Sequence, residues 1–153
     1  MSIEQVKEYF QEFRIDGRIQ EFVESSATVD EAAAAVGVIP ARIAKTLSFK
    51  EEDTAILVVT AGDMKIDNKK FKTRFGYKAK MLSPDEVLHF TGHAIGGVCP
   101  FGLRNKLDVY LDESLKRFET VFPACGSSHS AIELSLDELQ TYSKATDWVD
   151  VCK

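Results

Sequence analysis

The sequence predicts one α+β domain spanning residues 1–153, with a barrel-like mixed β-sheet surrounded by short helices. Its 153 residues suit a single hydrophobic core and leave no room for a second domain of ordinary size. Hydrophobic residues make up 44% and charged residues 28% of the chain, as in folded globular proteins. Short strand patterns alternate with short helix patterns, which favours a curved sheet with helices around it.

Two capping-box pairs, Ser2 with Gln5 and Thr28 with Glu31, mark helix starts near the N-terminus. Apolar residues recur at helical spacing after Ser2, and Gly37 supplies a stop after the alanine run. We therefore expect helices over 2–14 and 28–36, with a short strand over 19–23 between them.

A hairpin is predicted in the next part of the chain. Pro40 suits the first turn of a short helical segment, because its missing N–H is not needed there. Two apolar runs, 45–49 and 55–60, are separated by acidic residues, which predicts two antiparallel strands. A helix over 67–75 is then expected to end at Gly76, before a short strand over 79–82.

The second half begins with a strong helix start. Ser83, Pro84 and Glu86 supply the N-cap, the first-turn proline and the capping-box acid of a helix that ends at Gly92. The glycine-rich stretch 96–102 favours neither helix nor central strand. The remaining expected elements are strands over 109–111, 121–124 and 132–134, a helical turn over 112–118, a helix over 136–143 capped by Ser135 and Glu138, and a return to the sheet over 148–151.

The charge of the chain is unevenly distributed. The net charge is −5, which by itself disfavours a polyanionic partner. Between Met64 and Met81, however, seven positive charges face one negative charge, that of Asp67, so this segment alone carries +6. It is either a solvated helix face or a surface that binds a polyanion. The basic residues are Lys65, Lys69, Lys70, Lys72, Arg74, Lys78 and Lys80.

Lys45 is the first candidate functional residue. If strand spacing begins at Ile43, then Lys45 shares a face with Leu47 and Phe49, so a lysine is directed toward apolar neighbours. Burial of an ammonium is costly unless the group is paired or used. Lys45 therefore either extends to water at the strand end or faces a cleft. Side chains alternate across a strand, so we expect only one of Thr46 and Leu47 to share a pocket with Lys45.

Three glycine-containing turns are further candidates. Adjacent glycines at Gly96 and Gly97 allow a backbone to approach a ligand and present N–H groups to an anion, while Pro100 stiffens the loop. The Gly62-Asp63 turn and the Gly126-Ser127-Ser128 turn have the same potential. Each of these is also compatible with an ordinary tight connection.

Metal and thiol sites receive little support. His89 and His93 are four residues apart, but Phe90 occupies the position of a metalloprotease glutamate and Gly92 ends the helix, so we expect no metal and no cofactor. Cys125 with His129, or Cys99 with His93, offers a thiol nucleophile only if the fold brings each pair together. A buried, inert thiol is the ordinary alternative.

The sequence also predicts a cytoplasmic protein that does not enter a membrane. The N-terminus lacks the basic and apolar regions of a signal peptide, and no segment approaches the ~18 apolar residues that span a bilayer. Three cysteines without CxxC pairing indicate neither a disulfide framework nor a zinc site.

Taken in order, these motifs resemble the YbaK family, which includes EbsC proteins and the editing domain of bacterial prolyl-tRNA synthetases. The resemblance covers nearly the whole chain after the first helix. The matching stretches are Thr28-Val29-Asp30-Glu31-Ala32-Ala33, Ala44-Lys45-Thr46-Leu47, Gly62-Asp63, Ile66-Asp67, Thr91-Gly92, Gly96-Gly97-Val98-Cys99-Pro100-Phe101-Gly102, Gly126-Ser127 and Ile132-Glu133-Leu134-Ser135.

The resemblance implies a hydrolase that cleaves the ester between a wrong amino acid and the tRNA 3′ end. It assigns catalytic roles to Lys45 and to the backbone at Gly96 and Gly97. The substrate-binding positions that it implies are Thr28, Thr46, Asp63, Val98, Cys99, Pro100, Gly126 and Ser127. We expect tRNA to contact Lys69, Lys70, Lys72 and Arg74.

The resemblance also implies partners and alternatives. Aminoacyl-tRNA is the expected partner, with transient contact to prolyl-tRNA synthetase, and the oligomeric state stays open. The Lys45-Thr46-Leu47 motif is similar to the YbaK-like and EbsC-like branch, which favours a Cys-tRNA(Pro)-like substrate. Cys99 stands where many members carry serine, and His93 where an aromatic residue is common. The alternative is a module of EbsC type that binds a nucleotide or tRNA end without hydrolysis.

Overall fold

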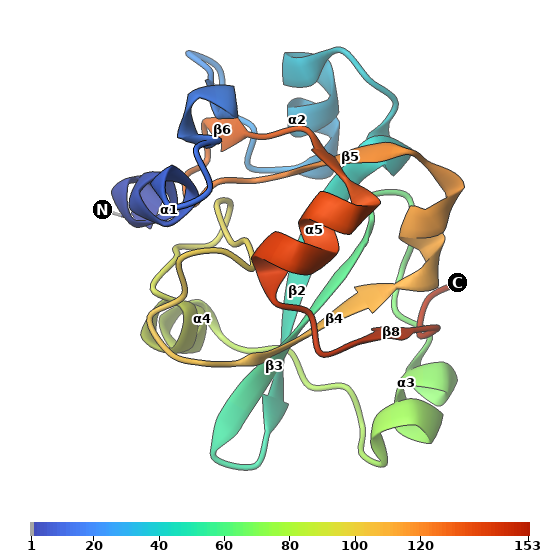
Figure 1. Ribbon diagram of the computed structural model, residues 1–153. Helices are drawn as coiled ribbons and strands as arrows, with labels where there is room; N and C mark the ends of the chain where they lie inside the picture. Colours follow the sequence, from blue (N-terminus) through green and yellow to red (C-terminus); the bar gives the residue numbers. More distant parts are fainter. Residues whose placement is uncertain (1) are drawn as a thin grey trace.

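The computed structural model describes residues 2–153, and its centre is a six-stranded sheet (Figure 1). The strands lie in the order β7-β5-β2-β3-β4-β8, and two further strands, β1 and β6, form a separate pair. Their bounds are β1 Gln20–Glu21, β2 Ile43–Glu51, β3 Thr54–Ala61, β4 Asp108–Asp112, β5 Thr120–Pro123, β6 Ser130–Ala131, β7 Leu134–Ser135 and β8 Asp147–Val149.

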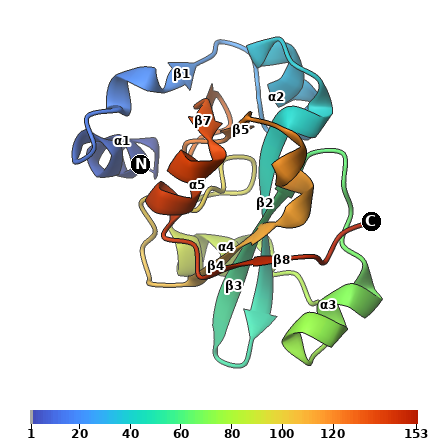
Figure 2. The same cartoon turned by 45° about the vertical axis from the view of Figure 1, so that its right-hand side comes forward.

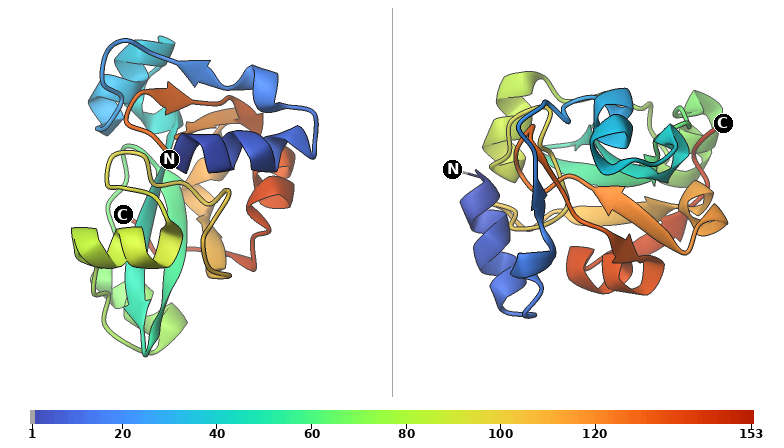
Figure 3. Two further views of the ribbon diagram at one scale, coloured as in Figure 1. Left: turned by 90° about the vertical axis from the view of Figure 1, so that its left-hand side faces the viewer. Right: turned by 90° about the horizontal axis from the view of Figure 1, so that it is seen from above.

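The six-stranded sheet is mixed and curled (Figure 3). The β2–β3 hairpin is antiparallel, and β5 and β4 run parallel to β2 and β3 on either side of it. The edge strands β7 and β8 pair only inward among the described residues, so the curl resembles a barrel without closing. The predicted α+β fold with a barrel-like mixed sheet is therefore confirmed.

Five α-helices formed by residues 2–153 surround the sheet, with α3 and α4 on opposite sides of the β2–β3 hairpin (Figures 1 and 2). Capping boxes begin α2, α4 and α5, as their sequences predict. No helix within residues 2–153 is long and apolar enough to cross a membrane. The helices are α1 Ser2–Gln11, α2 Val29–Val36, α3 Asn68–Phe75, α4 Pro84–Thr91 and α5 Leu136–Ser143, with short 3-10 turns at Asp16–Arg18, Pro40–Arg42 and Glu113–Arg117.

Several element predictions need correction. Ser2 lies inside α1 and its hydroxyl donates to the Gly126 carbonyl, so the predicted capping box there is wrong. The helix ends at Gln11 rather than near Arg14. The predicted strand 132–134 is not formed as one strand, because β6 ends at Ala131 and β7 begins only at Leu134. The strand expected at 79–82 is reduced to a single bridge between Met81 and Phe49. Short strands held by few pairs are poorly marked by local pattern.

The two largest apolar clusters of the described residues pack on the sheet. The larger one joins α1 and α5 to β3, β4 and the loop after α4, with the rings of Phe10 and Phe101 4.8 Å apart. The smaller one places Phe49 of β2 against Phe71 of α3, with ring centroids 4.8 Å apart. The predicted apolar face with Leu47 and Phe49 is thus present beside Lys45.

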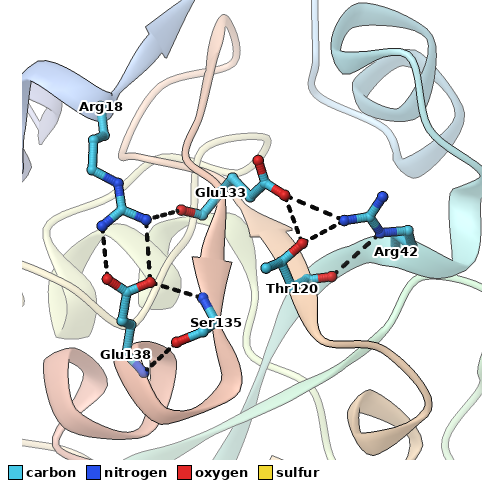
Figure 4. A network of polar contacts seen from close by, with 6 residues as sticks. All are labelled: Arg18, Arg42, Thr120, Glu133, Ser135 and Glu138. Atoms are coloured by element: carbon cyan, nitrogen blue, oxygen red, sulfur yellow. Dashed lines mark hydrogen bonds and ion pairs between the residues drawn. The ribbon is translucent and has the colours of Figure 1, made fainter.

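A polar network fixes the start of β2 (Figure 4). Arg42, immediately before β2, donates through Nε to the Thr120 carbonyl of β5 at 3.3 Å, and the Thr120 hydroxyl donates to Glu133 at 2.6 Å. Arg18 spans the Glu133 carbonyl at 2.6 Å and the Glu138 carboxylate of α5 at 2.7 Å. These bonds join four elements around the strand that carries Lys45.

Candidate active site

A cavity of about 240 Å³ lies along the edge of β2 that faces away from β3. Its walls come from separate parts of the chain: the start of α2, residues 43–48 of β2, Met81 and Leu82, the loop at 95–98, and the region from β5 to β6. Most of the wall is apolar, and the ionisable residue in it is Lys45. Met81 and Ile95 are large apolar residues that remain 58% and 60% exposed at this cavity.

The cavity brings together part of the predicted site. Lys45 and Gly96, which lie far apart in the sequence, both line it. Thr28, Thr46 and Val98 line it as well, although the Thr28 hydroxyl is already engaged in capping α2. The remaining predicted positions stand outside its lining: Asp63, Gly97, Cys99, Pro100, Gly126 and Ser127.

The expected alternation at β2 does not hold for this cavity. Both Thr46 and Leu47 line it together with Lys45, so the expectation that only one of the two would do so is wrong. The reason is that the cavity lies at a strand edge, where consecutive residues border the same space whichever face their side chains take. Sequence parity identifies a face but does not show which edge is open.

The Lys45 ammonium is half-buried and held by the chain itself. Its Nζ donates to the Met64 carbonyl. Burial lowers the pKa of Lys45 below its usual value, while the nearby Cys152 thiol and Asp63 carboxylate act in the opposite direction. The lysine is thus neither fully solvated nor paired with a carboxylate, and it is positioned for a further partner.

The C-terminal segment holds the loop that carries Met64. Lys65 and Lys153 exchange two backbone hydrogen bonds of 3.1 and 2.8 Å, and Asp67 N–H donates to the Val151 carbonyl at 2.8 Å. The Val151 N–H in turn donates to the Asp112 carboxylate at 2.9 Å. The Met64 carbonyl that positions Lys45 is therefore held in place by residues 151–153, which lie far from it in the sequence, and no local motif indicates this pairing.

Asp63 forms a bidentate ion pair with Arg117. The two guanidinium nitrogens lie 2.6 and 3.0 Å from the carboxylate oxygens. The hydrogen bonds from Arg117 are the main reason that the pKa of Asp63 is lowered. Asp63 thus joins the β3–α3 turn to the turn after β4, and its substrate-binding role stays a prediction.

The two loop glycines differ in what they offer. Gly96 has φ of +96° and lines the cavity, and no hydrogen-bond acceptor within residues 2–153 takes its N–H. The Gly97 N–H donates to the Ala94 carbonyl at 3.0 Å, so it is not free to bind an anion. A Cβ at Gly97 would lie 2.5 Å from the Ser127 nitrogen. Gly97 therefore permits close packing against the Gly126-Ser127 turn.

The thiols are not arranged as nucleophiles. Cys99 Sγ lies 3.6 Å from His93 Nε2, but this nitrogen also lies 2.7 Å from the Phe101 carbonyl, to which it donates. Both side chains are fully buried, and burial raises the pKa of the Cys99 thiol to about 12. Cys125 is buried while His129 is exposed. His89 is exposed and His93 buried, and no group of metal-ligating side chains occurs within residues 2–153.

The basic segment is only partly free. Lys70 Nζ lies 3.1 Å from Asp150, and Arg74 lies 3.1 Å from Asp147. Arg74 also stacks over the rings of Phe75 and Tyr110. These two residues tie α3 to the C-terminal segment. Lys69 and Lys72 are the exposed cations of α3 that are left for a polyanion.

The fold and the cavity define a class of protein. Residues 23–142 match the family model of the aminoacyl-tRNA editing domain, which is most of the chain. The chain belongs to this family, as its sequence motifs predict.

Individual relatives refine this assignment. An uncharacterized protein of Bacillus subtilis, YwhH, is 58% identical over all of this chain and 98% of its own length. EbsC of Enterococcus faecalis, a candidate Cys-tRNA(Pro)/Cys-tRNA(Cys) deacylase, is 27% identical over 73% of this chain and 70% of its own. A solved structure of a candidate trans-editing enzyme for prolyl-tRNA synthetase superposes with a TM-score of 0.89, at 31% identity, over 99% of this chain and 97% of that one.

Proposed function

We propose that this protein is a free-standing deacylase that removes a wrong amino acid from tRNA, with tRNA(Pro) as the expected carrier. The observation that carries the proposal is the meeting of Lys45 and Gly96 at one cavity. A binding module without hydrolysis would not need both groups at one place. The relatives named for Cys-tRNA(Pro) deacylation and for trans-editing support the same substrate class.

The reaction is hydrolysis of an ester. Water attacks the ester carbonyl, the bond from the carbonyl carbon to the ribose oxygen breaks, and the products are a free amino acid and a tRNA 3′ end. The Gly96 N–H stabilises the oxyanion that forms, a contribution of ~3 kcal/mol for one preorganised donor. Lys45 exchanges the Met64 carbonyl for the terminal phosphate or the substrate carbonyl.

The base that activates water comes from the substrate. No carboxylate, histidine or cysteine lines the cavity in the part of the chain that the structure describes. A ribose hydroxyl or the amino group of the amino acid is therefore the proton acceptor. Cys99→Ser is expected to keep its turnover, because the serine hydroxyl can still donate to the Phe101 carbonyl. Complete loss of turnover would support a thiol mechanism instead.

The tRNA body is held outside the cavity. We assign part of this surface to Lys69 and Lys72 on α3, while Lys70 and Arg74 are engaged in ion pairs. Phosphate contacts from these lysines would offset the repulsion expected from the net charge of −5.

A deacylation assay tests the proposal. tRNA(Pro) carrying cysteine, alanine, serine or proline is incubated with the protein and with Lys45→Ala, and loss of the aminoacyl group is followed. We expect fast release of at least one non-cognate amino acid by the wild type and loss of that activity in the variant. If tRNA is bound but no ester is cleaved in the whole panel, the binding module of EbsC type is the correct function.

A further inference from the structure

The outer edge of β2 is interrupted at a single residue. Lys50 N–H donates to the Lys80 carbonyl at 2.8 Å, and the Ser48 carbonyl accepts from Leu82 N–H at 3.2 Å. The backbone groups of these even-numbered residues thus point away from β3. In an antiparallel ladder this direction alternates along the strand, so Thr46 presents both its N–H and its carbonyl to the same outer edge.

Nothing in the described chain occupies the edge at Thr46. On one side Ala44 pairs with Pro123 of β5, and on the other side the segment 80–82 bonds to Ser48 and Lys50. Within residues 2–153 no backbone bond joins Thr46 to a strand on its outer side, and its hydroxyl oxygen is buried without a partner. Buried polar groups are nearly always paired, so this gap requires water or a ligand.

The cavity fills the gap. Ala124 follows β5 on one side of Thr46, Leu82 lies on the other, and Gly96 belongs to the loop that also lines the space. A group that enters the cavity therefore meets one free N–H and one free carbonyl on a single residue.

We propose that the backbone of Thr46 binds the aminoacyl group of the substrate. The aminoacyl group pairs with the edge of β2 as a strand of one residue would. An aminoacyl ester carries an amine and a carbonyl on either side of one carbon, which is the pattern that a strand residue offers to its neighbour. The Thr46 N–H donates to the ester carbonyl, and the Thr46 carbonyl accepts from the amine. This inference rests on the proposed function and deepens it by identifying which part of the substrate is recognised.

The arrangement recognises the amine without a carboxylate. Among residues 2–153, Lys45 is the one ionisable residue of the cavity wall, so uncharged acceptors must bind the amine. The Thr46 N–H remains bonded to the carbonyl oxygen as it becomes an oxyanion, which adds a second donor to that of Gly96. The Gly97 N–H donates to the Ala94 carbonyl and is not available to the oxyanion. The Thr46 N–H therefore replaces Gly97 as the second donor to the oxyanion.

The length of the gap sets a limit on the substrate. It spans one residue, and residues 80–82, which bond to Ser48 and Lys50, close it beyond the Thr46 carbonyl, where the amine is bound. An acyl group on the amine would extend along the strand edge into these residues, whereas the ribose on the ester carbonyl lies at the opposite end and leaves the strand edge. The site therefore accepts aminoacyl-tRNA and rejects N-acylated forms, which include peptidyl-tRNA.

The first experiment varies the substrate. Alanyl-, seryl- and cysteinyl-tRNA(Pro) are compared with the same tRNAs after N-acetylation, using the wild-type protein. For the amino acid that is released fastest, we expect kcat/KM to fall at least tenfold on acetylation. Equal rates for the free and acetylated esters overturn the role of Thr46 and leave the deacylase function standing. Absence of hydrolysis for all three free esters overturns the deacylase function itself.

The second experiment varies the donor. Thr46→Pro removes the outward N–H, and proline is tolerated where the N–H of an edge strand points away from its neighbour. Thr46→Val is the matched control, because it removes the hydroxyl and keeps both backbone groups. We expect kcat of Thr46→Pro to lie at least tenfold below that of Thr46→Val, with circular dichroism showing both to be folded. Equal kcat in two folded variants overturns the proposal, and if Thr46→Pro does not fold, the acetylation result decides.

Discussion

Replacement of Lys45 by methionine separates its function from its share in stability. Methionine keeps the apolar stem and removes the ammonium, which costs the hydrogen bond to the Met64 carbonyl, about 1.5–3 kcal/mol for a charged donor. Relief from burying a charge offsets this loss, as replacements of buried charges by apolar groups are often neutral. We expect the unfolding free energy to change by no more than ~1 kcal/mol, or ~4 °C in Tm. Turnover should fall by ~10²–10³, the effect of losing one transition-state partner.

The sign of the pH dependence gives an additional check. Burial lowers the pKa of Lys45 in the folded protein, so between that pKa and the ordinary 10.5 the unfolded chain binds more protons. Wild-type stability should therefore rise with pH in this window, and Lys45→Met should lose that rise.

Thermal unfolding and single-turnover deacylation measure these effects, with Lys50→Met as the control. Lys50 lies on the same strand but pairs with Glu86 at the surface, 2.8 Å away, so its loss should leave turnover intact. Full turnover in Lys45→Met, or a Tm fall of ~10 °C or more, would refute the reasoning.

Three further outcomes are expected. Gly96→Ala should lower the single-turnover rate more than the tRNA affinity, because an alanine at φ +96° costs ~1–3 kcal/mol and its Cβ would lie 3.1 Å from the Ala27 methyl. A loss of affinity with an unchanged rate would contradict this. Glutamates at Lys69 and Lys72 should weaken tRNA binding and reduce its salt slope by ~0.7–0.9 per lost contact, while an aminoacyl-adenosine ester is still hydrolysed; an unchanged slope in filter binding would exclude this surface. The hydrogen bonds from Arg18 lower the pKa of Glu138 to about 2, so the stability that this ion pair adds is present above pH 4.5 and is lost as the pH falls toward 2. In Arg18→Gln the Tm should therefore depend less on pH over this range, and an unchanged Tm profile would assign acid unfolding to other groups.

The sequence predicts the fold best where local rules and packing agree. The helices at 28–36, 83–92 and 135–143 begin with capping boxes, and each box is formed. The hairpin of β2 and β3 follows from two apolar runs around an acidic turn. The motifs also identify Lys45 and Gly96, which the fold brings to one cavity.

Other parts of the site depend on long-range pairing that no local pattern records. The open edge at Thr46 exists because β5 stops at Pro123 and residues 80–82 pair farther along β2. The Gly97 N–H is satisfied within its own turn, which a glycine motif does not reveal. Met81 and Ile95 enter the cavity wall from segments without strand or helix, so their role emerges only in three dimensions.

The pairing of residues 65–67 with residues 151–153 has a consequence for biosynthesis. A chain emerging from the ribosome can form the β2–β3 hairpin early, since that contact is local in sequence. The Met64 carbonyl, which accepts the hydrogen bond from Lys45, is fixed only after Lys153 has emerged, because the neighbouring Lys65 forms its backbone hydrogen bonds with Lys153. A growing chain therefore has its lysine in place long before the hydrogen bonds that orient it. We expect the Lys45 ammonium to reach its final orientation only after residues 151–153 have been synthesised.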